Sequence, residues 1–357
     1  MGTRAKAGTS LEALIKLAQP LLKEAERQCP RTGPGAKPII PDWFIGVLIM
    51  VAVLKRKKSK SAQFRFVTDS MNRRQIRDIT GERQFPSRST FFSRYRRCHQ
   101  LFTKGIQLQG RQAIKEKIID ADEAAVDKSL VAARGRPWHK HEQKQGKIPR
   151  GVDVEAAWGY SEHHGWVYGY SFEVVVTSKR KDKTFPLLAS VGTGSAAEVR
   201  TFAGKIDELP PQVKRVSADK GYDANELGER IEFDSRGRRT GRRFLCPENP
   251  RNNKRKKTKP AGADAARAHS RKLRAARKKY LESATGQRLY RQRSKTVEPF
   301  NSWFKSHFEL DARAWHRGLA NNQTQILAAI FAYQLLVRFN HRCGNNNGQI
   351  RWLTDAL

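Results

Sequence analysis

The segment from residue 156 to residue 178 constrains the fold more than any other part of the chain. In AAWGYSEHHGWVYGYSFEVVVTS, aromatic and β-branched side chains occupy the even positions from Trp166 to Val176, and HHG provides a turn. Successive side chains of a strand point to opposite faces of a sheet, so a period of two predicts a β-hairpin. The chain therefore has to build a sheet around this hairpin.

Two further segments are predicted to be strands of the same sheet. EAAVDKSLVAA (residues 123–133) precedes the hairpin and QVKRVSAD (residues 212–219) follows it, with the amphipathic helix SAAEVRTFAGKIDELP in between. The order strand, strand, strand, helix, strand predicts a mixed α/β sheet, because it is not a series of βαβ units. Helices are also predicted for TVEPFNSWFKSHFEL and for NNQTQILAAIFAYQLLVRFN, the second packing on the sheet.

The first 110 residues are predicted to be helical. The apolar run Trp43–Leu54 follows a Pro-Asp start signal and is too short to cross a bilayer, so we expect a buried helix. Ser87 is the expected N-cap of a later basic helix that carries Arg94, Arg96 and Arg97. A short helix, a turn and a basic helix suit helix-turn-helix DNA binding; the alternative is a helical bundle with a solvated basic face.

The charge of the chain points to a polyanionic partner. Seventy Lys and Arg residues face 34 Asp and Glu residues, for a formal net charge of +36. Nucleic acid is the first candidate partner, because cations that neutralise phosphates release counterions, and an anionic membrane surface is the second. Cations are densest between residues 236 and 279. This stretch includes Lys254, Arg255, Lys256 and Lys257, which suit phosphate contacts unless the stretch is a flexible solvated insertion.

Cysteine usage and the N-terminal sequence indicate the compartment. The four cysteines stand alone and form no C-x-x-C pair, which argues against a zinc ribbon or a thioredoxin-type redox site and favours a reducing interior. The N-terminal segment lacks the apolar core and cleavage site of a secretory signal. We therefore expect a cytoplasmic protein.

Carboxylates at the ends of predicted elements are the candidates for chemistry. The sequence has no Walker A, G-x-G-x-x-G or G-x-S-x-G motif, and its histidines lack metal-ligand spacing. Asp127 lies within the first predicted strand, Asp219 ends the last one, and Glu298 opens a helix. Three such acids could hold two Mg²⁺ or Mn²⁺ ions for phosphoryl transfer, since hard cations prefer oxygen ligands. Singly, Asp219 could instead cap a turn, and the helix dipole could favour Glu298.

The segments that carry these acids resemble a known family. AVDKSLVAARGRPWH, AWGYSEHHGWVYGYSFEVVV, VSADKGYDAN and TVEPFNSWFKSHF are similar to blocks of bacterial insertion-sequence DDE transposases. The resemblance implies a ribonuclease-H-like mixed sheet flanked by helices over residues 117–340, with a basic insertion at about 236–285. It also implies an all-helical DNA-binding region over residues 1–110, and it leaves residues 341–357 as a tail.

The resemblance assigns roles to single residues. It implies that Asp127, Asp219 and Glu298 are the catalytic acids and metal ligands, with Asp120 and Asp122 as alternatives for the first acid. The Tyr-Arg-Glu-Lys signature of the family matches Glu298 and, seven residues on, Lys305, which would point at a DNA phosphate. Tyr290 and Arg293 keep their mutual spacing but stand one residue too far upstream, because Ser294 occupies the expected Arg position. Trp158 or Trp166 could stack on a flipped base or pack within the hairpin.

The expected function is that of a transposase. Such a protein binds the terminal inverted repeats of its element in double-stranded DNA, cleaves a strand and joins it to target DNA, as a homodimer associated with the nucleoid and without a membrane. The alternatives are an inactivated DNA-binding relative, a ribonuclease-H-like nuclease that does not join strands, and a basic ribosome-associated protein.

Overall fold

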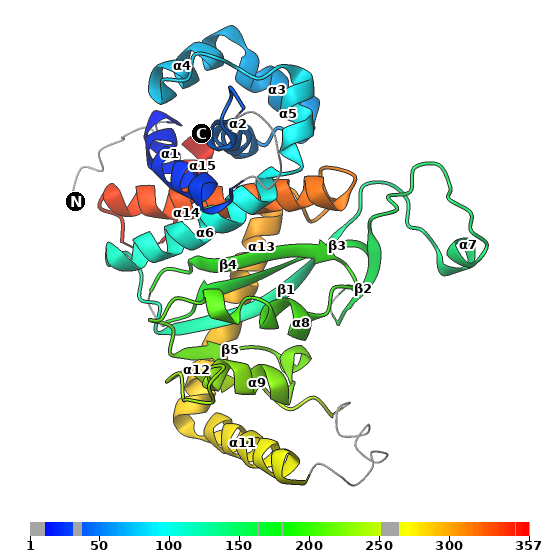
Figure 1. Ribbon diagram of the computed structural model, residues 1–357, viewed down its shortest axis with the longest axis vertical. Coiled ribbons are helices and arrows are strands. Elements are labelled where there is room, and N and C mark those ends of the chain that lie inside the picture. Colours follow the sequence, from blue (N-terminus) through cyan, green and yellow to red (C-terminus); the bar gives the residue numbers. More distant parts are fainter. Residues whose placement is uncertain are drawn as a thin grey trace.

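The chain folds into a mixed sheet with helices on both faces and a layer of helices at one end (Figure 1). The computed structural model describes residues 11–30, 38–162, 164–179, 182–250, 264–346 and 348–356. Lys254, Arg255, Lys256 and Lys257 lie outside these residues, as does His163 of the predicted hairpin turn. None of the helices within the described residues is long and apolar enough to span a membrane.

The described residues before 116 contain helices joined by loops, and no strands. Their bounds are α1 Leu11–Gln28, α2 Asp42–Leu54, α3 Lys60–Thr68, α4 Ser70–Thr80, α5 Arg88–Tyr95 and α6 Cys98–Lys115. Every residue of α2 after Asp42 is buried, which confirms the predicted core helix. The hydroxyl of Ser87 accepts a hydrogen bond from the Thr90 amide (3.2 Å), which confirms the N-cap of α5.

The described strands form one six-stranded sheet. Their bounds are β1 Glu123–Ala132, β2 Ala157–Ser161, β3 Gly165–Thr177, β4 Pro186–Thr193, β5 Arg215–Ser217 and β6 Arg243–Leu245. The β2–β3 hairpin is confirmed, and the longer β3 also pairs antiparallel with β4 and with β1. On its other side β1 pairs parallel with β5, and β5 with β6, so the sheet is mixed as predicted. Strands β4 and β6 were not predicted from the sequence.

The remaining helices cover the sheet and extend it at one end. They are α7 Lys140–Lys144, α8 Glu198–Ala203, α9 Asn225–Glu232, α11 Asp264–Glu282, α12 Ala284–Ser294, α13 Val297–His307, α14 Leu319–Arg342 and α15 Arg351–Ala356, with short 3₁₀ turns at Ile206–Glu208 and Lys220–Tyr222. Figure 1 shows α13 running behind the sheet, α7 on a projecting arm, and α11 at the far end from the N-terminal helices. The ring of Phe304 on α13 packs against Phe172 of β3 at 5.3 Å.

The helical region and the sheet share one hydrophobic core. Helix α14 contacts β4 as well as α6 and α2, which confirms that it packs on the sheet. The side-chain amide of Gln109 on α6 donates to the Phe331 carbonyl of α14 (2.9 Å). Helix α6 also contacts β4 and runs five residues past the boundary predicted at residue 110.

The end of the described chain is helical. Helix α14 continues to Arg342, two residues beyond the boundary expected at residue 340. In the segment that follows, α15 forms, and both Ile350 and Leu353 are buried.

Candidate active site

The parallel pairing of β1 with β5 brings the first two predicted acids together. Ala125 pairs with Ser217 in this register, and two residues beyond each partner stand Asp127 and Asp219. Residues at the same level of neighbouring parallel strands point to the same face of the sheet. The two carboxyl groups are close enough to interact, since the charge of Asp219 helps to raise the pKa of Asp127.

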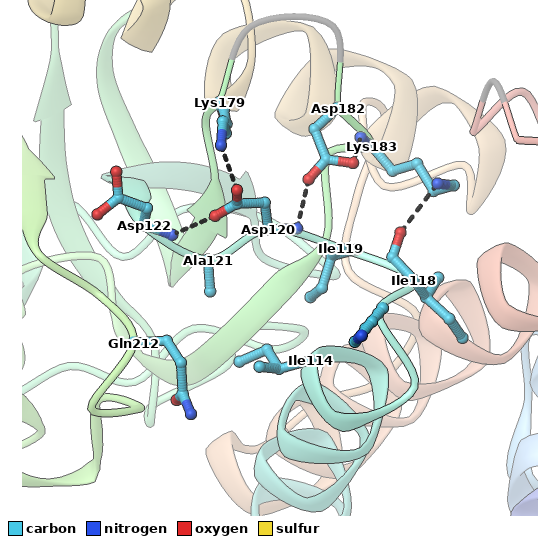
Figure 2. A pocket seen from close by; sticks show the side chains of 11 residues that line it. Ile114, Ile118, Ile119, Asp120, Ala121, Asp122, Lys179, Asp182, Lys183 and Gln212 are labelled. Carbon is cyan, nitrogen blue, oxygen red and sulfur yellow. Dashed lines mark hydrogen bonds and ion pairs between the residues drawn. The ribbon is translucent and has the colours of Figure 1, made fainter.

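The alternative first acids, Asp120 and Asp122, lie just before the start of β1. Asp120 is ion-paired with Lys179, and Asp122 with Arg215. Figure 2 shows Asp120 and Asp122 lining a separate pocket beside Lys179. The hydrogen bond from Lys179 lowers the pKa of Asp120, so this carboxylate already has its counterion. The register of β1 and β5 therefore favours Asp127 as the acid beside Asp219.

The turn after β5 holds Asp219 in place. The Asp219 carboxylate accepts a hydrogen bond from the Gly221 amide (2.8 Å), and its main-chain carbonyl accepts one from the Cys246 thiol (2.9 Å). A Cβ atom at Gly221 would clash with the Glu198 carboxylate and come within 3.0 Å of Oδ1 of Asp219. A side chain here would therefore make the Glu198 carboxylate move and would crowd the Asp219 carboxylate.

Asp127 is a largely enclosed carboxyl group in the middle of β1. Its side chain is 18% exposed. The Asn301 amide donates to its Oδ2 (2.9 Å), and Nη1 of Arg293 lies 3.8 Å from its Oδ1. Burial raises the pKa of Asp127 to about 7; Asp219 and Glu298 add to this, while Arg293 opposes it. This carboxyl group can therefore change protonation near neutral pH.

Arg293 links the third acid to the first. Glu298 stands in the first turn of α13 with a half-exposed side chain, and Nη1 of Arg293 lies 3.5 Å from its Oε1. Helix α12 ends at Ser294 and α13 begins at Val297. Lys295 and Thr296 lie between these helices and separate Arg293 from Glu298. Arg293 therefore reaches both Asp127 and Glu298, and its guanidinium lies 5.9 Å from the Tyr290 ring.

Lys305 lies two turns beyond Glu298 on α13. Its ammonium is 3.8 Å from the Asp311 carboxylate, and little of its side chain is exposed. Its predicted contact with a DNA phosphate would therefore compete with Asp311.

A second group of ionisable residues surrounds Lys128 and Glu173, whose side chains point to the opposite face of the sheet. Lys128 follows Asp127 in β1 and pairs with Glu173 of β3, so both point away from the Asp127 face. Tyr222 donates to the Glu173 carboxylate (2.9 Å), and burial raises the pKa of Glu173 to about 8. Lys128 donates to the Ala196 carbonyl (2.7 Å) and lies 3.9 Å from Glu198. Sequence reasoning missed Glu173 and Glu198, although a charged residue inside an apolar strand was a usable signal for the first.

The second carboxylate of the DKGYD segment anchors the insertion. Asp223 forms an ion pair with Arg274 of α11 (2.6 Å) and accepts a hydrogen bond from the Asn249 amide (2.7 Å). Both charged side chains are almost fully enclosed. The described part of the predicted insertion therefore contains an ordered strand and helix, β6 and α11, fixed to the turn that carries Asp219.

The other predicted DNA contacts separate into buried and exposed residues. Arg94 is buried, and its guanidinium pairs with Asp42 and the Ile40 carbonyl, so it joins α5 to the start of α2 and does not face solvent. Arg97 is exposed but follows the end of α5. Trp158 packs on Tyr168 with its ring centroid at 5.5 Å, as expected of hairpin packing, whereas Trp166 is 61% exposed.

The chemistry of the acids suits a hard divalent cation, but no closed ligand cluster is formed. Within the part of the chain that the structure describes, no three His, Cys, Asp or Glu side chains converge as a metal site. The Arg293 guanidinium supplies positive charge between Asp127 and Glu298 instead. Oxygen donors are nevertheless available, because beside these carboxylates the Oδ1 atom of Asn301 is buried without a hydrogen-bond partner among the described residues.

Comparison with known proteins identifies the family. No curated protein sequence matches the chain. A weak structural similarity is found to a piggyBac transposase in a cryo-EM synaptic complex with hairpin DNA, with 12% identity and a TM-score of 0.43 over 99% of this chain and 79% of that chain. The family model described as a transposase DDE domain matches residues 114–335, which span β1, β5 and α13 and so include Asp127, Asp219 and Glu298. The chain therefore belongs to the family of transposase DDE domain proteins.

Proposed function

We propose that this protein is a DNA transposase that cleaves a strand at the ends of a mobile element and joins it to target DNA. The observation that carries the proposal is the β1–β5 register, which brings Asp127 level with Asp219, together with the contact of Arg293 with both Asp127 and Glu298. Carboxylates from two neighbouring strands and one helix form an oxygen-rich site of the kind that phosphoryl transfer requires. We also propose that the mixed sheet is a ribonuclease-H-like catalytic core, as the sequence resemblance implies.

Asp127, Asp219 and Glu298 would hold Mg²⁺ or Mn²⁺, with two ions expected. Bound there, divalent ions supply Lewis-acid stabilisation of the charge that develops on the phosphoryl group. Arg293 would exchange its carboxylate contacts for a DNA phosphate once the acids are neutralised, because a guanidinium binds either anion in the same forked geometry. The Tyr290 ring, 5.9 Å from the Arg293 guanidinium, would hold that side chain in place. Lys305, two turns after Glu298 on α13, would contact a second DNA phosphate.

The basic surface would bind the DNA backbone. In helix α11, Arg274 points inward to Asp223, while Arg271, Lys272 and Lys279 are exposed. Arg97 lies in the helical region, at the other end of the molecule from α11, and would make a separate phosphate contact. Phosphate contacts by Lys254, Arg255, Lys256 and Lys257 remain a prediction from the sequence. A net charge of +36 predicts strong, salt-dependent binding to duplex DNA. We propose that two copies act together in the cytoplasm, since two DNA ends have to be joined to one target.

The test is strand cleavage and joining on DNA that carries the sequences flanking this reading frame. Asp219→Asn should abolish cleavage by more than about 100-fold while DNA binding stays measurable, because the turn still receives the Gly221 hydrogen bond. Asp207→Asn is the matched control, since its carboxylate is 90% exposed and pairs with the surface residue Arg230. Normal cleavage by Asp219→Asn would exclude the proposed site. Cleavage without joining by the wild-type protein would indicate a nuclease, and binding without cleavage would indicate an inactive relative.

A further inference from the structure

Only one of the two polar atoms of the Asn301 side chain, in the candidate site, has a hydrogen-bond partner among the described residues. Asn301 stands three residues after Glu298 on α13, so the two side chains share one face of the helix. The residue is 5% exposed, and its Nδ2 atom donates to Oδ2 of Asp127 at 2.9 Å. Its Oδ1 atom is also buried but has no hydrogen-bond partner among the described residues.

The orientation of this amide is set by Asp127. An ionised carboxylate accepts hydrogen bonds and cannot donate them, so the NH₂ group has to face Asp127 and the carbonyl oxygen has to face elsewhere. A buried carbonyl without a donor is unfavourable, and the hydrogen bond to Asp127 accounts for the NH₂ group of Asn301 but not for the burial of its Oδ1 atom. Packing alone therefore does not explain a polar residue here.

Resting on the proposed function, we infer that Asn301 is a fourth residue of the cation site. Its Nδ2 atom orients the Asp127 carboxylate, and its Oδ1 atom is a ligand for the divalent ion held there. Amide carbonyl oxygens are common ligands of hard divalent cations. A neutral ligand suits this position, because the carboxylates of Asp127, Asp219 and Glu298 already place negative charge around the site.

The test measures Mn²⁺ binding by the full-length protein through the loss of the free-ion signal in electron paramagnetic resonance. Asn301→Leu should weaken Mn²⁺ binding by roughly 10–100-fold. Asn301→Asp should bind Mn²⁺ at least as tightly as the wild type, because it keeps an oxygen ligand and adds charge. Asn72→Leu is the control, since it removes a comparable amide hydrogen bond, to the Phe66 carbonyl, within the N-terminal helices; it should leave Mn²⁺ affinity unchanged.

Thermal melting of the same variants separates ligand from scaffold. Without ions, Asn301→Asp places two carboxylates against each other and should melt below the wild type; with Mn²⁺ it should gain more thermal stability than the wild type does. The inference is overturned if Asn301→Leu only lowers the melting temperature while Mn²⁺ affinity is retained, or if Mn²⁺ stabilises Asn301→Asp no more than the wild type.

Failure of the proposed cation site itself has a different signature. Asp219→Asn should lose Mn²⁺ binding. Both the site and the role of Asn301 would be overturned if Asp219→Asn bound Mn²⁺ as the wild type does, or if the wild type bound no Mn²⁺. Binding that is lost in Asp219→Asn but kept in Asn301→Leu would overturn the role of Asn301 alone.

Discussion

Replacing Asp127 with asparagine should stabilise the ion-free protein at high pH. Burial raises the pKa of this carboxyl group to about 7, against an ordinary value of 3.8. The folded state therefore holds the proton more tightly than the unfolded chain does, and folding stability falls as the pH rises from about 4 to about 7. Above pH 7 the full cost of the buried charge is present in the wild type, whereas the neutral amide of the Asp127→Asn variant avoids it.

The size of the effect follows from the same pKa. The difference between 3.8 and about 7 corresponds to a cost of about 4 kcal/mol at high pH, at about 1.4 kcal/mol per pH unit. Asparagine keeps an acceptor for the Asn301 amide, and the attraction of Arg293 for the charged carboxylate is already contained in the pKa of about 7. The gain is therefore about 4 kcal/mol at pH 8.5 and about 2 kcal/mol at pH 5.5, where the unfolded chain is ionised but the folded protein still holds the proton.

The assay is denaturant unfolding of both proteins in EDTA at pH 5.5 and pH 8.5. The control is Asp120→Asn, because the hydrogen bond from Lys179 lowers the pKa of Asp120 and its loss should destabilise the fold at both pH values. The reasoning is refuted if Asp127→Asn is no more stable than the wild type at pH 8.5, or if its advantage is the same at pH 5.5.

Further predictions concern the turn after β5, helix α11 and DNA. Tyr222→Phe should cost about 1–3 kcal/mol in denaturant unfolding, because it leaves the buried Glu173 without its donor; unchanged stability would show that this contact does not hold the turn. Gly221→Ala should reduce strand cleavage at least 10-fold with DNA binding retained, since the added methyl group displaces Glu198 and Asp219; Gly237→Ala, at an open turn, should cleave normally. Arg274→Ala should cost about 3 kcal/mol and speed hydrogen exchange in α11 first, because Asp223 is left enclosed without its partner; uniform exchange rates would contradict the anchoring role. Replacing Arg271 and Lys272 with alanine should lower the slope of log Kd against log salt concentration by about 2, measured on a short duplex; an unchanged slope would place the DNA elsewhere.

The sequence predicts elements whose pattern is strong within a single segment. The β2–β3 hairpin, β1, α2, α13 and α14 were all predicted, because each has a clear period or start signal over ten or more residues. Strands β4 and β6 were not predicted, and for β6 the physical reason is clear. Strand β6 has three residues in an arginine-rich stretch, and it exists because Arg215 and Ser217 of β5 offer it a parallel edge to pair with.

In the site, too, the sequence predicts what lies within one segment but not what depends on contacts between segments. The order of Asp127, Asp219 and Glu298 along the chain was readable, but the choice of Asp127 over Asp120 required the register of β1 on β5. Glu198 and Asn301 carry no local signal at all. Glu198 approaches Asp219 only because Gly221, which lies between them, has no side chain. Asn301 reaches Asp127 only because it stands one helical turn after Glu298 on α13.

The basic residues show why charge composition alone does not locate a binding surface. Arg94 and Arg274 both stand in helices that carry several cations, but Arg94 pairs with the enclosed Asp42, and Arg274 pairs with the enclosed Asp223 and with Glu248. Such pairs fix helices to one another, whereas Arg271 and Lys272 of α11 are exposed to solvent. A cation that an enclosed acid already neutralises gains little from a phosphate, because the pair would have to break and leave the acid unpaired. The DNA surface of this transposase-family chain should therefore follow its outward-facing cations, and α11, which Arg274 fixes to Asp223, presents Arg271 and Lys272 among them.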